Sequence, residues 1–372
     1  MIRAFKYRLY PTRRQAAELE QWLESCRVLY NTALEQRISV FHSCGKSLSY
    51  VEQAADLTAL RGYDESYKAI SCVVEQDSLR RLDKAFMAFY SRVKHGEFGG
   101  FPRFRGKGRY NTLGMPIAKI ADNRLSVPNL GYVKFRKYRP LRGKVRCASI
   151  TYKNNRWWVS IICDLGFAPQ KSAVRSAVGI DMGLTSFATL SNGDTIPNPR
   201  FYRHGEAKLA KRQQPLSRKQ KGSKSRERAK VLVGRAYEHI HNQRLDHARK
   251  TAAVLYSTYD LIAHEDLNIK GMIISNDGRL AKSINDAAWR QFICAVQSKA
   301  EYAGKYAIAV NPRGTTQRCS GCQQIAPKTL AERNHLCPQC GLALGRDHNA
   351  ARNILALGES VAAETSKTWF AT

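Results

Sequence analysis

Residues 177–190 read AVGIDMGLTSFATL, and this stretch decides the fold of the second half of the chain. Apolar side chains alternate with small ones up to Met182, and a second apolar run follows from Phe187 to Leu190. The pattern predicts two strands joined by a short turn. Asp181 lies within the first strand, where burying a lone ionised carboxylate is costly without a cation or a hydrogen-bond donor. The stretch therefore predicts a buried acid with a chemical role.

An aspartate on a central strand can offer both of its oxygens to a pair of divalent ions. Ribonuclease-H-like nucleases begin in this way, and two such ions activate a water and stabilise the leaving oxygen of a phosphodiester. Actin-like kinases begin with a similar strand. This stretch alone leaves both classes open.

The charge of the chain indicates its partner. Its 372 residues, enough for two or three domains, carry 61 Lys and Arg against 30 Asp and Glu, a formal net charge of +31. Ribosomal, membrane-surface and nucleic-acid proteins carry such an excess. No apolar run is long enough to span a membrane, and no basic helix with an apolar face stands out. We therefore expect a nucleic-acid partner, no membrane and no small-molecule substrate.

The cellular compartment is predicted from the N-terminus and the cysteines. The basic N-terminal residues lack the apolar core of a signal peptide, and six of the ten cysteines are scattered, which suits reduced thiols. We expect a cytoplasmic, nucleoid-associated protein.

The first part of the chain combines strands with inserted helices. Residues 2–10 form a predicted basic strand. Helices are expected after the capping pairs Thr12 with Gln15 and Ser49 with Glu52, and a third helix over residues 66–94. A small barrel, which the N-terminal strand joins, is predicted from short strands at 125–127, 132–135, 145–152 and 156–163.

Two basic stretches are candidates for nucleic-acid contacts. Residues 101–110, FPRFRGKGRY, interleave aromatic and basic side chains, a pattern that fits a stacking loop and a solvated loop equally well. Residues 200–230 hold twelve Lys or Arg and two acids, and Pro215 interrupts them. A polyanion is the partner that this imbalance predicts. The candidate contacts are Arg103, Arg105, Lys107, Arg218, Lys219, Lys221, Lys224 and Arg244.

A helix is expected over residues 237–259, with three histidines. His239, His241 and His247 lack a matching set of acids or cysteines, so we expect them to face RNA or solvent rather than a metal. A short strand at 260–266, an amphipathic helix at 284–302 and a strand at 305–310 follow.

Two further acids accompany Asp181. The strand at 260–266 ends in Glu265 and Asp266, and the alternation of side chains does not choose between them. Asp347 lies in the first turn of a predicted helix near the C-terminus. Three carboxylates on core elements are what a two-metal site requires.

Four cysteines form the most specific local motif. Cys319 and Cys322 make one CxxC pair, and Cys337 and Cys340 make another. Two such knuckles deliver four thiolates to the corners of a tetrahedron, which predicts a structural zinc ribbon with one Zn²⁺. The competing interpretation is a redox pair, which would need a thioredoxin-like strand and helix that this region lacks.

These motifs together resemble the TnpB (OrfB) family of transposon-encoded proteins, relatives of the type V CRISPR effectors. The resemblance covers almost the whole chain, and the matching stretches occur in family order. They are FKYRLYPTRRQ, FPRFRGKG, VGIDMGLTSFATL, SRKQKGSKSRERAK, HNQRLDHARK, EDLNIKGM, NPRGTTQRCSGC, CPQCG and RDHNAARNI. One departure is Gly345, where many relatives carry an additional Asp.

The resemblance implies an α+β multidomain fold. It assigns the catalytic, magnesium-binding acids to Asp181, Glu265 and Asp347, and so prefers Glu265 to Asp266. The implied domains are the first strand of a wedge β-barrel (1–10), a helical recognition lobe (11–98), the rest of the barrel (99–172), a RuvC-like, ribonuclease-H-like nuclease domain (173–312), an inserted zinc ribbon (313–344), a final RuvC helix (345–360) and a disordered tail (361–372).

The implied function is RNA-guided cleavage of double-stranded DNA next to a short target-adjacent motif. Two Mg²⁺ ions and one Zn²⁺ ion are the expected cofactors, and a guide RNA derived from the transposon end and the target DNA are the expected partners. Base pairing would read the sequence while the protein reads backbone and shape. Two other functions stay open, a guide-directed DNA-binding regulator without cleavage and a strand-transferring transposase.

Overall fold

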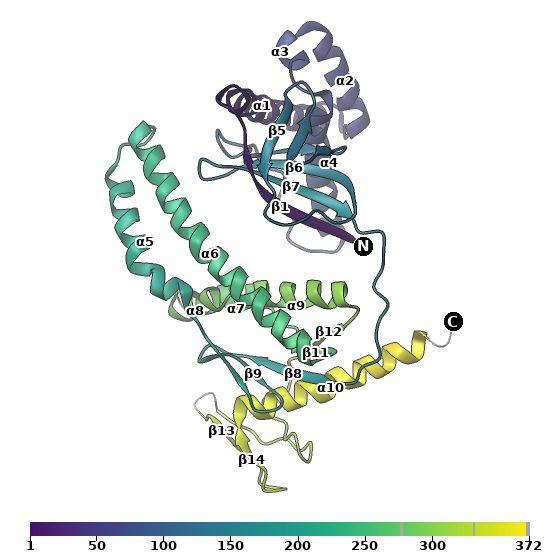
Figure 1. Cartoon of the computed structure of the whole chain (residues 1–372), viewed down its shortest axis with the longest axis vertical. Helices are drawn as coiled ribbons and strands as arrows, with labels where there is room; N and C mark the ends of the chain where they lie inside the picture. Colours follow the sequence, from purple (N-terminus) through teal and green to yellow (C-terminus); the bar gives the residue numbers. More distant parts are fainter. Residues whose placement is uncertain (276–277, 330–331, 370–372) are drawn as a thin grey trace. The chain divides into compact units, whose positions relative to one another are not determined.

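The computed structural model describes residues 1–275, 278–329 and 332–369 of the chain. The chain forms two compact units, Met1–Ala168 and Pro169–Thr372, so the division falls slightly before the predicted boundary at residue 172. Figure 1 traces their elements along the sequence. No helix within the described ranges is long and apolar enough to cross a membrane.

The first unit is built on a seven-stranded sheet with the order β2-β6-β7-β1-β5-β4-β3. The N-terminal strand β1 lies between β5 and β7 and pairs antiparallel with both, as expected. Residues 1–168 are all described, and no pairing joins the edge strands β2 and β3, so the sheet is open along these edges and forms part of the predicted small barrel. The strands are β1 (Ile2–Tyr10), β2 (Thr112–Met115), β3 (Lys119–Ala121), β4 (Arg124–Val127), β5 (Gly131–Arg136), β6 (Lys144–Tyr152) and β7 (Trp157–Asp164).

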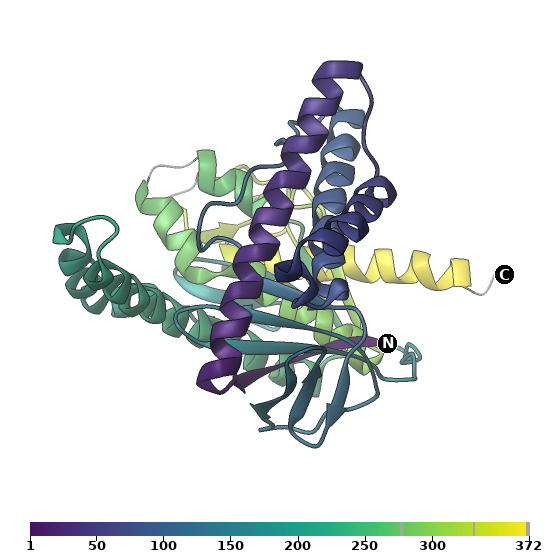
Figure 2. The same ribbon diagram turned by 90° about the horizontal axis from the view of Figure 1, so that it is seen from above.

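Two helices of this unit begin at the predicted caps. Thr12 closes a capping box with Gln15 at the start of α1 (Arg13–Cys44), and Ser49 does the same with Glu52 at the start of α2 (Tyr50–Tyr63). The buried stripes of α1 and α4 (Cys72–Lys94) pack with the sheet in one hydrophobic core. Figure 2 shows α1 and α4 side by side.

The single helix expected over residues 66–94 is wrong. The structure has a short helix α3 (Glu65–Lys68), a break, and then α4. The Arg61 guanidinium donates to the carbonyl oxygens of Tyr67 and Ile70, and the Ile70 side chain is buried at the break. This arginine binds carbonyl groups that a continuous helix would have used for its own hydrogen bonds.

The second unit contains a five-stranded sheet with the order β10-β9-β8-β11-β12. Strand β8 pairs antiparallel with β9, whereas β11 pairs parallel with both β8 and β12. The strands are β8 (Ala177–Met182), β9 (Ser186–Leu190), β10 (Thr195–Pro197), β11 (Leu261–Glu265) and β12 (Tyr306–Val310).

Helices cover both faces of this sheet (Figure 1). Side chains of β8, including Val178 and Ile180, share a core with α6 (Lys224–Thr258) and α9 (Trp289–Ala303). The opposite face carries α10 (Arg346–Trp369), which packs on β8 and β11. A small two-stranded sheet of β13 (Asn334–Leu336) and β14 (Ala343–Gly345) precedes α10.

The helices of the second unit differ from the predicted ones in several places. Helix α5 (Phe201–Arg218) contains Pro215 in its last turn, and α6 begins at Lys224 rather than near residue 237. The expected helix at 284–302 is divided at Ala288, whose φ of 55° ends α8 (Gly278–Ala287) before α9 begins. Helix α7 (Ile269–Ser275) precedes them. Helix α10 continues to Trp369, through most of the predicted tail, and residues 370–372 lie outside the described residues.

Candidate metal centres and nucleic-acid surface

Asp181 and Glu265 lie on neighbouring parallel strands. The register of β8 and β11 pairs Ile180 with His264, and the two acids follow directly on their own strands. Because side chains at matching positions of parallel strands point to the same face, both carboxyl groups face α10. Glu265 is buried and Asp266 is exposed, which separates the two acids that the alternation of side chains could not.

Two glycines allow α10 to lie close to this face of the sheet. A Cβ at Gly179 would overlap the Ala351 carbonyl oxygen of α10, and a Cβ at Gly358 of α10 would overlap the Ala263 side chain of β11. A Cβ at Gly179 would lie on the same face of β8 as the side chain of Asp181, two residues later. Asp347 stands one helical turn before Ala351, so the close packing brings its carboxylate to the same part of the sheet.

The charges of Glu265 and Asp347 act on Asp181. The pKa of Asp181 is raised to about 7, mainly by burial and then by the carboxylates of Glu265 and Asp347, while the Arg346 guanidinium opposes the rise. Burial also raises the pKa of Glu265. Asp347 is more open, with 37% of its side chain exposed and Arg346 Nε 3.1 Å from its Oδ1. Mutual repulsion of carboxylates is relieved when a divalent cation binds them, so the donor set fits hard, oxygen-binding metal ions.

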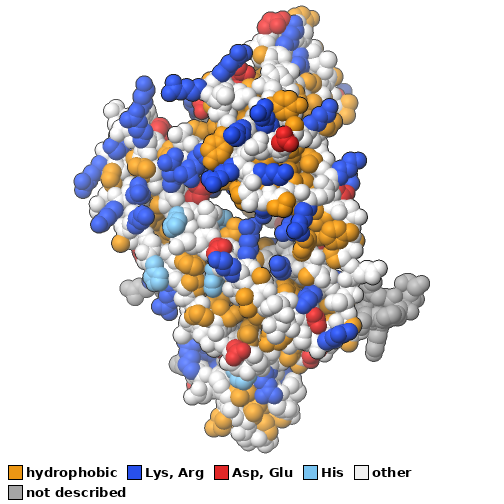
Figure 3. Space-filling model, viewed as in Figure 1, with side chains coloured by type: hydrophobic (Ala, Val, Ile, Leu, Met, Phe, Trp, Pro, Cys, Tyr) orange, Lys and Arg blue, Asp and Glu red, His pale blue; other side chains and the backbone are white. Residues whose placement is uncertain are grey.

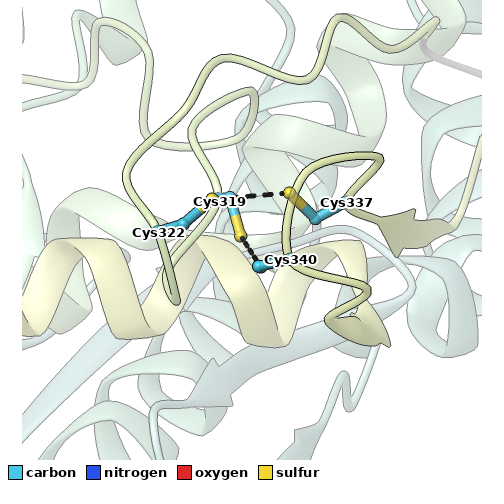
Figure 4. Close-up of side chains that lie close together, drawn as sticks. All are labelled: Cys319, Cys322, Cys337 and Cys340. Atoms are coloured by element: carbon cyan, nitrogen blue, oxygen red, sulfur yellow. Dashed lines mark hydrogen bonds between the residues drawn. The ribbon is translucent and has the colours of Figure 1, made fainter.

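The four cysteines form a much more compact group (Figure 4). Their four sulfur atoms lie within 4.8 Å of one another. Cys319 Sγ is 3.6 Å from Cys340 Sγ, and Cys322 Sγ is 3.5 Å from Cys337 Sγ. A tetrahedral Zn²⁺ with bonds of about 2.3 Å separates its sulfurs by about 3.8 Å, so the cluster fits zinc with little movement. The redox interpretation is not supported, since the cluster lies in loops and a small hairpin.

The backbones of the two knuckles repeat each other. The Gln323 amide donates to the Cys319 carbonyl at 2.9 Å, and the Gly341 amide donates to the Cys337 carbonyl at 3.0 Å. Both donors have positive φ values, 66° for Gln323 and 71° for Gly341. Amides of Cys340 and Gln339 lower the pKa of Cys337 to about 6, which favours the thiolate that a metal binds.

Polar residues that the sequence analysis missed lie between the two groups. Thr315, Asn349 and Asn353 are all buried, and each has a hydrogen-bond partner. The spacing of the two asparagines in RDHNAARNI, four residues apart on one helix face, was the available signal, since buried asparagines need polar partners.

The basic loop of the first unit is held against α1. The Asn31 side chain accepts from the Arg105 amide at 2.7 Å and donates to its carbonyl at 3.0 Å, and the Arg105 guanidinium lies over the Tyr30 ring. Arg103 and Lys107 are exposed on the same loop. The structure thus gives this loop a backbone held against α1 and exposed cationic side chains, one of which, Arg105, lies over an aromatic ring.

The second basic stretch forms the hairpin of α5 and α6. Arg218, Lys221 and Lys224 are exposed around its turn, whereas Lys219 is half-buried with its Nζ 2.6 Å from Ser225 Oγ. Lys and Arg side chains gather over this hairpin in Figure 3. A cleft of about 540 Å³ between the two helices is lined by basic and imidazole side chains together with Phe201 and Leu232.

Two residues that were predicted to face nucleic acid or solvent make contacts inside the second unit. Arg244 has 17% of its side chain exposed, pairs with buried Asp286 at 3.0 Å and lies over the Tyr202 ring, so these contacts hold it against α5 and α8. His247 is half-buried, and its ring packs edge-on against Phe187 and Phe201. His239 lines the α5–α6 cleft, and His241 bonds with Gln291.

Family comparisons match three parts of the chain. A family described as "Probable transposase" (OrfB_IS605) matches residues 150–275, and "Cas12f1-like, TNB domain" matches residues 289–354. A third, "Helix-turn-helix domain", matches residues 1–46. In that range the structure has strand β1 and the single helix α1, so the pair of helices that the description names is absent from these fully described residues.

Relatives with similar sequences extend over nearly the whole chain. A protein of Streptomyces pristinaespiralis named "Putative RNA-guided DNA endonuclease" is 33% identical, covering 97% of this chain and 90% of its own length. A protein of Escherichia coli K12 named "Putative RNA-guided DNA endonuclease InsQ" is 28% identical, covering 97% and 94%.

Solved structures share the fold at low identity. The Cas12f1 chain of a Cas12f1-sgRNA-target DNA complex matches with a TM-score of 0.60 and 12% identity, covering 95% of this chain and 98% of that one. A mini-RNA-guided endonuclease, CRISPR-Cas_phi3, matches with a TM-score of 0.52 and 10% identity, covering 96% and 92%. At these identities the likeness establishes the mixed α/β fold alone.

Proposed function

This chain belongs to the TnpB (OrfB) family, and we propose that it is a transposon-associated RNA-guided endonuclease that cleaves double-stranded DNA next to a short target-adjacent motif. The names of its full-length relatives support the activity. The single observation that carries the proposal is the meeting of Asp181, Glu265 and Asp347 on one face of the second unit's sheet.

The three acids are the proposed ligands of two Mg²⁺ ions. When bound, such ions activate a water and stabilise the leaving oxygen of the phosphodiester. The contribution of the chain is to hold the ligands in place. Strand β8 fixes Asp181, strand β11 fixes Glu265, and the close packing of α10 on Gly179 fixes Asp347. The raised pKa of Asp181 means that it must lose its proton before it can bind a metal.

We assign the second unit to a RuvC-like nuclease domain. Its sheet combines the antiparallel strands β10-β9-β8 with the parallel strands β11 and β12, and its acids lie on β8, β11 and the helix that follows the cysteine cluster. The four cysteines are the proposed ligands of one structural Zn²⁺, in a ribbon inserted before α10. In the first unit, the open sheet is the proposed wedge domain, and α1 to α4 are the proposed recognition lobe.

The positive charge supplies the proposed binding surface for RNA and DNA. The hairpin of α5 and α6 and the loop at 101–110 present exposed Lys and Arg side chains, which suit backbone phosphates. We propose that the guide RNA comes from the transposon end and that the protein works in the cytoplasm at the nucleoid.

Sequencing of the RNA that copurifies with the protein tests the guide. The ribonucleoprotein is then incubated with Mg²⁺ and two plasmids, one matching the variable end of that RNA and one scrambled. We expect double-strand cleavage of the matching plasmid alone. Binding without cleavage would identify a regulator, joined DNA ends would identify a transposase, and a random collection of RNA with equal treatment of both plasmids would refute guidance.

A further inference from the structure

A chain of buried hydrogen bonds connects the cysteine cluster to the acid group. At one end, Thr315 Oγ1 lies 2.6 Å from Glu265 Oε1 and 3.0 Å from the Pro312 carbonyl oxygen. An ionised carboxylate only accepts hydrogen bonds, so the hydroxyl donates to Glu265 whenever that acid is charged. Thr315 thereby opposes the effect of burial on the pKa of Glu265.

The middle of the chain of hydrogen bonds lies on α10. Asn353 Nδ2 donates to the Thr315 carbonyl at 2.8 Å and to the Arg318 carbonyl at 2.7 Å. Asn349 Nδ2 donates to the same Arg318 carbonyl at 2.8 Å. The two asparagines are 4% and 0% exposed, so these bonds form away from water, where leaving a polar group unpaired is costly.

The other end is the first cysteine knuckle. Asn349 Oδ1 accepts from the Ser320 amide at 2.9 Å, and Ser320 lies between Cys319 and Cys322. The helix that carries Asp347 therefore holds the backbone on both sides of Cys319, and this same backbone segment begins at Thr315. A shift of the knuckle must displace Thr315 or break bonds to α10.

On this geometry we propose that Thr315, Asn349 and Asn353 are positioning residues that couple occupancy of the cysteine site to the carboxylate site. Zinc fixes the knuckle, the asparagines fix residues 315–320 on α10, and Thr315 holds Glu265 in the conformation that binds a divalent ion. None of the three residues is a metal ligand. The proposal rests on the proposed role of the acids, and it adds a thermodynamic link between two sites that share no ligand.

Coupling of this kind is reciprocal. If zinc strengthens binding of a divalent ion at the acids, that ion must strengthen zinc binding by the same free energy. Slower zinc release is the expected sign of this tighter binding. Partners that orient metal ligands typically change metal affinity by about 10–100-fold when they are removed, which sets the size of the expected effect.

The test uses the full chain loaded with zinc, and Mn²⁺ as the probe. Calorimetry measures Mn²⁺ affinity for wild type, Thr315→Val, Thr315→Ser and Thr316→Val. Thr316 is the exposed neighbour and serves as the matched control. We expect Thr315→Val to weaken Mn²⁺ binding about tenfold, while the serine variant, which keeps the hydroxyl, and the control stay close to wild type.

A second measurement follows zinc transfer to a chromophoric chelator with and without Mn²⁺. Mn²⁺ should slow zinc loss from wild type and from Thr316→Val, but much less from Thr315→Val or Asn353→Leu. Circular dichroism at the assay temperature confirms that each variant is folded. If Asn353→Leu does not fold, the comparison of Thr315→Val with Thr315→Ser carries the test.

The outcomes separate this inference from the proposed function. If Mn²⁺ binds wild type and Asp181→Ala equally, the role of the acids fails and the coupling fails with it. If Asp181→Ala loses Mn²⁺ but Thr315→Val binds it as wild type does, with zinc release equally slowed, the acids keep their role and the coupling alone is overturned.

Discussion

The two candidate metal centres of the second unit are built in opposite ways. The cysteine site comes from two short knuckles with the same backbone pattern, and its sulfurs already lie within 4.8 Å of one another. The acid site takes one side chain from each of three elements, β8, β11 and α10, and the carboxylates of Glu265 and Asp347 add to burial in raising the pKa of Asp181. The comparison teaches that a local motif can pre-form a metal site, whereas a site assembled by the fold retains electrostatic repulsion that its ions must relieve.

Removing one of the three acids should have the largest effect on activity. Asp181→Ala should reduce Mg²⁺-dependent DNA cleavage by about a thousandfold or more, because a two-metal site supplies several kcal/mol of transition-state stabilisation. Guide and target binding should be nearly unchanged, since the basic surfaces are untouched. Single-turnover cleavage and a binding assay measure the two quantities.

Glu265→Ala and Asp347→Ala should behave in the same way. Asp266→Ala is the matched control, because Asp266 is the exposed neighbour of Glu265 and should retain activity. Full activity in any of the three acid variants would remove that residue from the site.

Breaking the cysteine site should have a smaller effect, exerted through structure. Cys319→Ser or Cys337→Ser should release zinc, lower the melting temperature and reduce cleavage by about 10–100-fold without removing a catalytic ligand. Elemental analysis, thermal unfolding and cleavage rates measure these changes. Cys294→Ser, an exposed cysteine outside the cluster, is the control. An intact protein that contains no zinc would contradict this assignment.

The pH dependence of protein stability tests the electrostatic repulsion at the acid site. The pKa of Asp181 is raised from 3.8 to about 7, so the folded protein holds an extra proton between these pH values. The free energy of unfolding, measured without added Mg²⁺ or Mn²⁺, should therefore fall as pH rises through this window, by on the order of 1 kcal/mol or more.

Asp181→Asn should flatten this slope, and added Mn²⁺ should offset the loss of stability at the upper end of the window. Denaturant unfolding at several pH values measures both effects. A slope of the same size in Asp181→Asn would show that other groups cause it.

The sequence predicted best those features that depend on a few neighbouring residues. The cysteine knuckles, the caps at Thr12 and Ser49, and the strand that carries Asp181 are of this kind. Features set by distant partners were missed. Arg61 of α2 binds carbonyl groups at the break between α3 and α4. Arg244 of α6 forms an ion pair with buried Asp286.

The acid site lies between these extremes. Strand position indicated Asp181, but side-chain alternation could not choose Glu265 over Asp266, because the choice depends on which face α10 covers. Family resemblance made that choice. In the structure, Gly179 and Gly358 allow α10 to approach the sheet closely. The short strands β2 and β3 were also missed.

Substitutions in the basic surfaces should have the smallest effects, and they should change nucleic-acid binding. Replacing Arg218 and Lys221 together by Gln should weaken RNA binding similarly for two unrelated guides. The slope of log affinity against log salt should become shallower by about 0.7–0.9 for each phosphate that the protein no longer neutralises. Replacing Arg103 and Lys107 tests the loop of the first unit in the same way. An unchanged slope would show that these side chains do not neutralise phosphates.

Arg244→Gln provides the contrast for these variants. It should lower stability by leaving buried Asp286 without its cation, with little change in the salt slope. Thermal unfolding together with the salt titration distinguishes the two kinds of arginine.

The central claim is that one unit holds two kinds of metal in two kinds of site. It is tested most directly by counting metal ions in the ribonucleoprotein bound to a matched, non-cleavable target. Zinc is measured by elemental analysis, and bound Mn²⁺ by electron paramagnetic resonance on the same sample. We predict one zinc and two Mn²⁺ per wild-type chain, and an Asp181→Ala chain that keeps its zinc and loses Mn²⁺. Equal Mn²⁺ in both proteins, or loss of zinc with the aspartate, would contradict the account.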